Sequence, residues 1–128
     1  MRWKILVVDD DPEVVELLRF NLRSAGFSVG TASNGRLALT KACSLDPDLI
    51  VLDLMMPSVN GFDVVEALRE GAETAQIPII VMTAKRITAE DHQRLDGAVT
   101  TIMEKGQFDR ARFTTEVRRA MSGRQTAH

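Results

Sequence analysis

The chain has 128 residues, 45% of them hydrophobic and 27% charged, with a formal net charge of −2 at pH 7. This length is that of one domain whose core is large enough to fold without disulfide bonds or a structural metal. The near-neutral charge argues against direct nucleic-acid binding, and the single cysteine, Cys43, excludes an internal disulfide and a cysteine-based zinc site. Because no apolar stretch is long enough to span a membrane and the N-terminus lacks a signal-peptide pattern, we expect a cytoplasmic protein with no membrane partner.

In the first half of the chain, short apolar runs alternate with helical patterns. Residues 4–8 (KILVV) form a continuous apolar run, which predicts a strand buried on both faces of a sheet. Asp11 and Pro12 predict the start of a helix, because Asp caps the first turn and Pro suits the first helical position. A weaker strand pattern covers residues 27–32, and Asn34 can cap a second helix.

The second half of the chain repeats the alternation. Pro78 lies near the start of one apolar run, where a strand tolerates the missing N–H. An apolar stripe at helical spacing predicts a final helix, after which we expect a short disordered tail over residues 123–128. The other predicted elements of this half are strands over residues 48–52, 77–82 and 99–103 and helices over residues 61–70 and 88–95.

Five strands that alternate with five helices predict an α/β fold. Right-handed crossovers join such strands into a parallel sheet with helices on both faces. The chain shows no internal repeat and no linker, so we expect one doubly wound domain over residues 1–122. Ligands of such open sheets bind beyond the carboxyl ends of the strands, which directs attention to the residues that follow each strand.

The residues after the predicted strands form a set with a chemical logic. Clustered carboxylates repel one another unless a cation neutralises them, and oxygen-rich sites suit Mg²⁺. An aspartate in such a site can be the nucleophile of phosphoryl transfer, with lysine and threonine side chains holding the other phosphoryl oxygens. The set comprises Asp9, Asp10, Asp11, Asp53, Thr83, Ala84, Glu104 and Lys105. Of these, we expect Asp11 to cap a helix and Glu104 to face solvent.

Four short motifs carry a resemblance to a known family. They are VVDDDP, VLDLMMP with Gly61 after it, VMTA and EKG, each at the end of a predicted strand. With these motifs at the family's spacing, the chain resembles the receiver domain of two-component response regulators from residue 3 to about residue 121. The resemblance implies a flavodoxin-like (βα)5 fold, with a five-stranded parallel sheet of order 2-1-3-4-5.

The resemblance implies a phosphoacceptor role for Asp53. This aspartate would take a phosphoryl group from a phosphohistidine of a sensor histidine kinase or a histidine phosphotransfer protein. Lys105 would pair with Asp53 and then with its phosphoryl group. Thr83 and the backbone N–H groups of Met55 and Ala84 would also bind the phosphoryl group. The domain would thus be a signalling switch and not an enzyme with a separate substrate, since it would catalyse only its own phosphorylation and dephosphorylation.

The resemblance also implies a Mg²⁺ site. Asp10 would be a direct ligand of the ion together with Asp53 and the backbone carbonyl of Met55, whereas Asp9 would act mainly through a metal-bound water. Pro57 and Gly61 would shape the neighbouring loop.

Three departures from the family pattern concern the last predicted strand and the residues after it. Gly106 follows the lysine where the family usually has proline, so we expect a trans peptide bond there, because a cis bond before a non-proline residue costs about 2.5–4 kcal/mol. Ile102 stands where the family often has an aromatic residue that rotates on activation. Thr100 and Thr101 replace a more usual acidic pair. The acceptor chemistry is therefore intact, whereas the route to the output surface must differ.

The output is expected to be a change in protein–protein contacts. The expected reporting surface comprises residues 87–95, residues 99–103 and the last helix, and a homodimer through this surface is one option. No effector domain follows the last predicted helix, so the chain is either a stand-alone receiver or the excised receiver of a larger protein. Two other functions stay open: an adaptor with the receiver fold that acts without phosphorylation, and a phosphohydrolase, which the short loops disfavour.

Overall fold

The computed structural model describes residues 3–56, 60–84, 86–107 and 109–126. Its strands are β1 (Lys4–Val8), β2 (Ser28–Ala32), β3 (Leu49–Leu52), β4 (Ile79–Thr83) and β5 (Thr101–Glu104). Its helices are α1 (Pro12–Ser24), α2 (Gly35–Leu45), α3 (Gly61–Glu70), α4 (Ala89–Leu95), the 3₁₀ turn η1 (Lys105–Gln107) and α5 (Arg110–Thr126).

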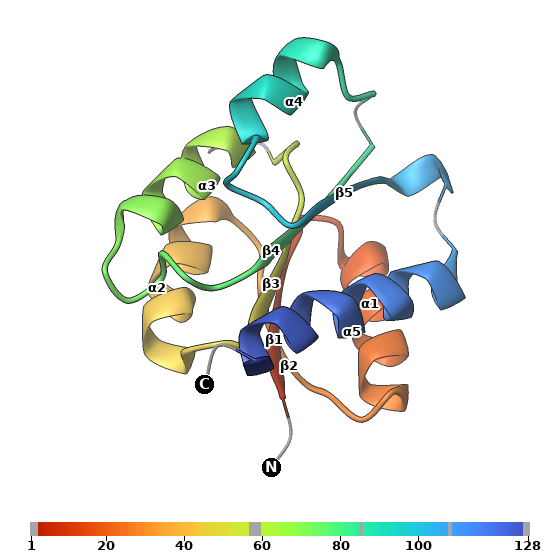
Figure 1. Ribbon diagram of the computed structural model, residues 1–128. Helices are drawn as coiled ribbons and strands as arrows, with labels where there is room; N and C mark the ends of the chain where they lie inside the picture. Colours follow the sequence, from red (N-terminus) through yellow and green to blue (C-terminus); the bar gives the residue numbers. More distant parts are fainter. Residues whose placement is uncertain (1–2, 57–59, 85, 108, 127–128) are drawn as a thin grey trace.

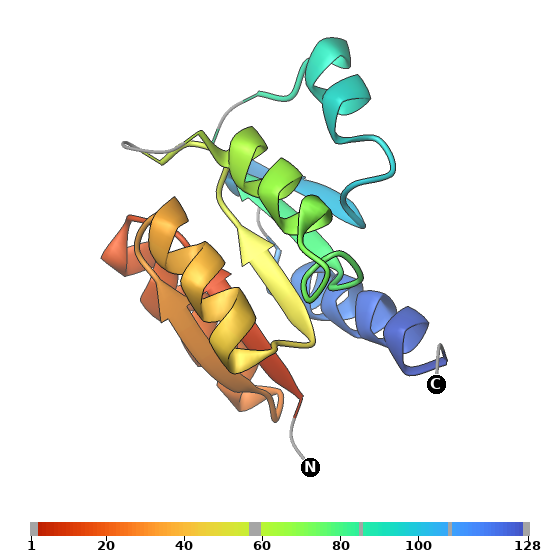
Figure 2. The same cartoon turned by 90° about the vertical axis from the view of Figure 1, so that its left-hand side faces the viewer.

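The five strands form one parallel sheet in the order β2-β1-β3-β4-β5, which confirms the predicted doubly wound fold and strand order. Helices cover both faces of the sheet (Figure 1). Helices α1 and α5 pack on one face, and α2, α3 and α4 pack on the other. Figure 2 shows α2 and α3 side by side over the second face. Within the described ranges, no helix is long and apolar enough to cross a bilayer.

The central strands are buried on both faces, as their continuous apolar runs predict. All side chains of β3 and β4 are buried, and in β1 only the first residue, Lys4, is partly exposed. Successive side chains of each strand point to opposite faces, so one strand contributes to two separate cores. In β1, for example, Leu6 packs with α2 and α3, whereas Ile5 packs with α1 and α5.

Side-chain caps set where the helices begin. The predicted caps are confirmed: Asp11 accepts a hydrogen bond from the N–H of Glu13 at 3.0 Å, and Asn34 accepts one from the N–H of Leu37 at 2.9 Å. Asn60 caps α3 in the same way. These bonds satisfy amide groups that have no partner inside the helix, which fixes the residue at which each helix starts.

The start of β4 differs from the prediction, because Ile77 and Pro78 lie outside the strand. The Arg69 guanidinium donates to the carbonyl oxygens of Ile77 at 2.9 Å, Ala75 at 2.7 Å and Ala98 at 2.7 Å. Arg69 therefore binds the chain entering β4 to the chain entering β5, and burial lowers the pKa of its guanidinium. Since the carbonyl of Ile77 is engaged by Arg69 and Pro78 has no N–H, hydrogen bonding to β3 begins at the carbonyl of Pro78, which accepts from the N–H of Ile50 at 3.0 Å.

The bounds of β5 and α5 also differ from the prediction. Strand β5 begins at Thr101 and ends at Glu104, two residues later and one residue later than predicted. Helix α5 extends through Thr126, into the stretch predicted as a tail, and residues 127–128 lie outside the described ranges. Gly123 does not stop the helix, because glycine inside a helix costs only about 1 kcal/mol relative to alanine.

Gly61 allows a close approach between the start of α3 and the chain that leaves β3. A Cβ atom at Gly61 would lie 2.4 Å from Cα of Leu54, and this backbone atom cannot rotate away. We expect Gly61→Ala to lower the free energy of unfolding by about 1–3 kcal/mol, the usual cost of overpacking. Urea denaturation measures this change.

The matched control is Gly106→Ala, since a Cβ atom at Gly106 would meet nothing within 4 Å. This variant should unfold at nearly the wild-type urea concentration. Equal stability of the two variants would contradict the account of Gly61.

Candidate functional site

Acidic side chains from two neighbouring strands meet at the carboxyl end of the sheet. Asp9 and Asp10 follow β1 and Asp53 follows β3, the strand paired with β1. One carboxylate oxygen from each of the three lies within 4.8 Å of the others. Asp9 and Asp53 are each only 3% exposed, whereas Asp10 is exposed. The predicted cluster thus exists, with two buried carboxylates and one at the solvent edge.

Lys105 bridges the two buried carboxylates. Its Nζ atom lies 2.7 Å from Oδ2 of Asp9 and 3.2 Å from Oδ2 of Asp53. The sequence predicted a partner for Lys105 in Asp53 and missed the closer one in Asp9. The spacing of the motifs places all three residues at one sheet edge but carries no signal for which carboxylate the ammonium approaches more closely.

Backbone N–H groups hold the remaining oxygens of the buried carboxylates. The N–H of Met55 donates to Oδ1 of Asp53 at 3.0 Å, and the N–H of Asp11 donates to Oδ1 of Asp9 at 2.9 Å. Each carboxylate therefore has one oxygen on a backbone amide and the other on the Lys105 ammonium. Both side chains are held in one orientation by groups on rigid strand ends.

The charges in the cluster shift two pKa values. Burial raises the pKa of Asp9 above its ordinary value, and the charge of Asp53 adds to this effect. The hydrogen bonds from Lys105 and from the N–H of Asp11 offset the rise only in part. Burial alone would lower the pKa of Lys105, but the hydrogen bond to Asp9 and the charges of Asp53 and Asp9 raise it overall. Lys105 is therefore firmly protonated, and the cluster as a whole has an excess of negative charge.

The other predicted site residues lie around this cluster. Thr83 is the last residue of β4, not the residue after it, and is 0% exposed. Ala84 follows it and is exposed. The Met55 side chain is 55% exposed, so this residue contributes its backbone to the site and leaves its side chain at the surface. Gly61 lies beside the loop as predicted, whereas Pro57 lies outside the described residues.

Two positions that depart from the family pattern lie in and after β5: Ile102 lies within the strand, and Gly106 lies in the turn that follows it. Gly106 lies within the 3₁₀ turn η1, and none of the described peptide bonds is cis, as predicted. Ile102 is half-buried. Glu104 was expected to face solvent, but it is only partly exposed, and its Oε1 atom accepts a hydrogen bond from the N–H of Ile87 at 3.3 Å. Nothing in the sequence pattern pairs these two residues, which lie on different elements.

Comparison with known proteins agrees with this arrangement. The family model of the response regulator receiver domain matches residues 5–118. The DNA-binding response regulator MtrA of Mycolicibacterium smegmatis is 46% identical over 90 residues, which are 70% of this chain and 38% of that protein. The DNA-binding dual master transcriptional regulator RpaA of Synechocystis is 38% identical over 115 residues, 90% of this chain and 47% of that protein. This chain thus spans less than half the length of these curated relatives.

A solved structure gives the same result for the fold. The chemotaxis protein CheY4 of Vibrio cholerae is 30% identical and superposes with a TM-score of 0.86 over 94% of this chain and 99% of that chain. This likeness supports the doubly wound fold with its five-stranded parallel sheet.

We expect Asp9→Asn to stabilise the protein in buffer without Mg²⁺. Because the pKa of Asp9 is raised by folding, its charged form is less favourable in the folded protein than in the unfolded chain. The variant should gain stability over wild type as the pH rises above the ordinary value of 3.8, with the full gain above the raised pKa. Below 3.8 the two proteins should converge, because Asp9 is then protonated in both states.

Urea denaturation at a series of pH values measures this difference. An Asp9→Asn protein that is less stable than wild type at pH 7 would show that the contacts of Asp9 outweigh the cost of its buried charge. That result would contradict the electrostatic account of the cluster.

Proposed function

The chain belongs to the response regulator receiver domain family, and we propose that it accepts a phosphoryl group from a phosphohistidine onto Asp53. The proposal is supported by the contacts that the structure gives to the Asp53 carboxylate. One of its oxygens is held by the N–H of Met55 and the other by the Lys105 ammonium, beside two further carboxylates. The phosphohistidine would belong to a sensor histidine kinase or a histidine phosphotransfer protein.

In the proposed reaction, a carboxylate oxygen of Asp53 attacks the phosphorus atom. A P–O bond forms as the P–N bond to the donor breaks, and the electron pair of that bond stays on the imidazole nitrogen, which takes up a proton. The groups that hold Asp53 orient its oxygens before the donor arrives, which lowers the entropic cost of the step. Because the nucleophile is a carboxylate oxygen, the step needs no general base to activate it.

The same groups can follow the phosphoryl group once it is transferred. The Lys105 ammonium and the N–H of Met55 both contact Asp53 in the unphosphorylated protein, so short movements bring them to phosphoryl oxygens. We propose that the Thr83 hydroxyl and the N–H of Ala84, at the end of the adjacent strand, complete the pocket. Donors preorganised around a developing charge are the usual source of such stabilisation.

The donor set fits a divalent cation of the Mg²⁺ type. Three carboxylates face one ammonium in the cluster, and Mg²⁺ prefers hard oxygen ligands with room for water molecules. Asp9, Asp10 and Asp53 would hold the ion, with the backbone carbonyl of Met55 as a further ligand. A Mg²⁺ ion there would neutralise the carboxylates and part of the charge of an incoming phosphoryl group.

We propose that the aspartyl phosphate changes protein–protein contacts. A new dianionic group draws Thr83 and Lys105 toward Asp53 and shifts an equilibrium between two arrangements of the surface formed by α4, β5 and α5. A downstream protein or a second copy of the chain would read this surface. The curated relatives are DNA-binding regulators, but for this acidic domain we propose no direct contact with nucleic acid.

We expect acetyl phosphate and Mg²⁺ to add one phosphoryl group to the protein, and Asp53→Asn to abolish the addition. Acetyl phosphate is a small donor, so the test needs no cognate kinase. Intact-protein mass spectrometry measures the adduct.

The matched control is Asp11→Asn, because Asp11 caps α1, asparagine caps equally well, and its carboxylate is not part of the cluster. This variant should be phosphorylated as the wild type is. A wild-type protein that gains no adduct would contradict the proposal and favour the adaptor function, whereas an adduct that persists in Asp53→Asn would place the acceptor elsewhere.

A further inference from the structure

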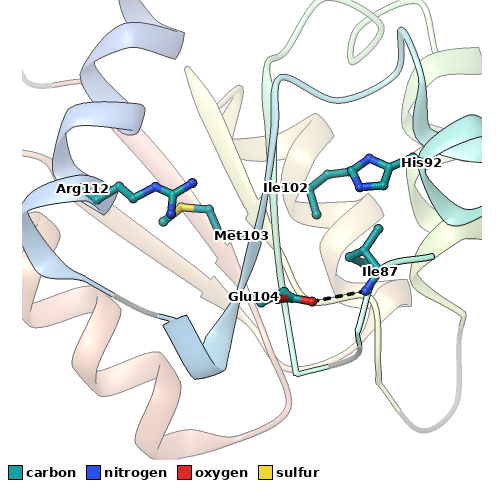
Figure 3. A pocket seen from close by; sticks show the side chains of 6 residues that line it. All are labelled: Ile87, His92, Ile102, Met103, Glu104 and Arg112. Carbon is teal, nitrogen blue, oxygen red and sulfur yellow. Dashed lines mark hydrogen bonds between the residues drawn. The ribbon is translucent and has the colours of Figure 1, made fainter. Parts of the chain in front are cut away.

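Two consecutive residues at the end of β5 contact two different parts of the protein. The Lys105 ammonium binds Asp9 and Asp53 in the acidic cluster. Glu104, the residue before it, points toward the segment that joins β4 to α4, where its Oε1 atom accepts a hydrogen bond from the N–H of Ile87 at 3.3 Å (Figure 3). A movement of the backbone at Lys105 therefore also moves the acceptor of Ile87.

Ile87 is rigidly joined to the start of α4. The next residue, Thr88, accepts a hydrogen bond from the N–H of Asp91, and the Asp91 carboxylate accepts one from the N–H of Thr88, both at 3.1 Å. This capping box fixes Thr88 to the first turn of the helix. Thr83 ends β4 and Ala84 follows it, so Ile87 lies in the chain between proposed phosphoryl-binding groups and a helix of the proposed output surface.

The side chains around this hydrogen bond leave a pocket beside it. A cavity of about 230 Å³ lies at the hydrogen bond, lined by Ile87, His92, Ile102, Met103, Glu104 and Arg112 (Figure 3). The half-buried side chains of Ile87 and Ile102 point toward each other across it. A segment released from Glu104 therefore has room to move without displacing the tightly packed side chains of β4.

We propose that Glu104 is a positioning residue that holds residues 86–88, which lead into α4, in their unphosphorylated arrangement. This proposal rests on the function proposed above. When Lys105 follows the phosphoryl group and Thr83 is drawn the same way, the two ends of the hydrogen bond move apart and Ile87 is released. The hydrogen bond therefore stabilises the unphosphorylated arrangement, and a protein without it populates the phosphorylated arrangement more often.

The test compares Glu104→Ala, which removes the acceptor, with Glu104→Gln, which keeps an oxygen at the same place. In the absence of a phosphoryl donor, amide hydrogen exchange at Ile87 should rise roughly tenfold in Glu104→Ala and stay near the wild-type rate in Glu104→Gln. With acetyl phosphate and Mg²⁺, Glu104→Ala should be phosphorylated roughly fivefold faster than wild type, because more molecules already have the receptive arrangement.

The matched control is Glu116→Ala, which removes the carboxylate that accepts from the Thr101 hydroxyl at 3.2 Å and leaves Ile87 untouched. It should match the wild type in both measurements. If Glu104 acts through Thr83, its removal should give no acceleration in a Thr83→Ala background, a result that a general loosening of the fold would not produce.

Three outcomes would overturn the proposal. Unchanged exchange at Ile87 in Glu104→Ala would show that the hydrogen bond does not hold the segment. An unchanged rate in a protein that does take up the phosphoryl group would show that the bond is not coupled to phosphorylation. A wild-type protein that takes up no phosphoryl group refutes the proposed function and this coupling together, while the exchange measurement still reports on the hydrogen bond itself.

Discussion

The excess of negative charge at the carboxyl end of β1 and β3 is the constraint on which the site depends. The two buried carboxylates lie side by side, and burial together with the charge of Asp53 disfavours the charge of Asp9. Among the described residues, Lys105 is the cation bonded to both, and its single charge faces three carboxylates. The strand order requires this meeting, because β1 and β3 are neighbours in the centre of the sheet and their ends cannot separate without breaking the sheet.

The burial of the strands decreases from this centre toward the β5 edge of the sheet. Asp9 and Asp53 extend from strands that are buried on both faces, and backbone amides fix their orientation. Strand β5 lies at the sheet edge, its side chains are mostly half-buried, and a pocket lined by residues of β5, α4 and α5 lies beside it. Asp53, the proposed phosphoacceptor, can thus be held in one place while the residues that lead into α4 move, as the proposed switch requires.

The sequence predicted the features that depend on patterns of neighbouring residues along the chain. Continuous apolar runs predicted the buried strands, Asp11 and Asn34 predicted helix starts, and the ends of the strands predicted the acidic cluster. Contacts between residues that are far apart in the sequence produce no such pattern. Two sets of hydrogen bonds depend on how α3, α4 and β5 pack, so they could be found only in the structure. They are the bonds from Arg69 to the chain entering β4 and the bond from the N–H of Ile87 to Glu104.

The excess charge leads to one direct test, a Mg²⁺ titration of the unphosphorylated protein followed by thermal unfolding. We predict that Mg²⁺ raises the unfolding temperature, with a gain of about 2.7 kcal/mol at one hundred times the dissociation constant. Asp10→Asn should lose most of this gain, because it removes the exposed member of the cluster, whereas Asp11→Asn should keep it. Equal stabilisation of Asp10→Asn and wild type, or none in either, would contradict the assignment of this cluster as a divalent-cation site.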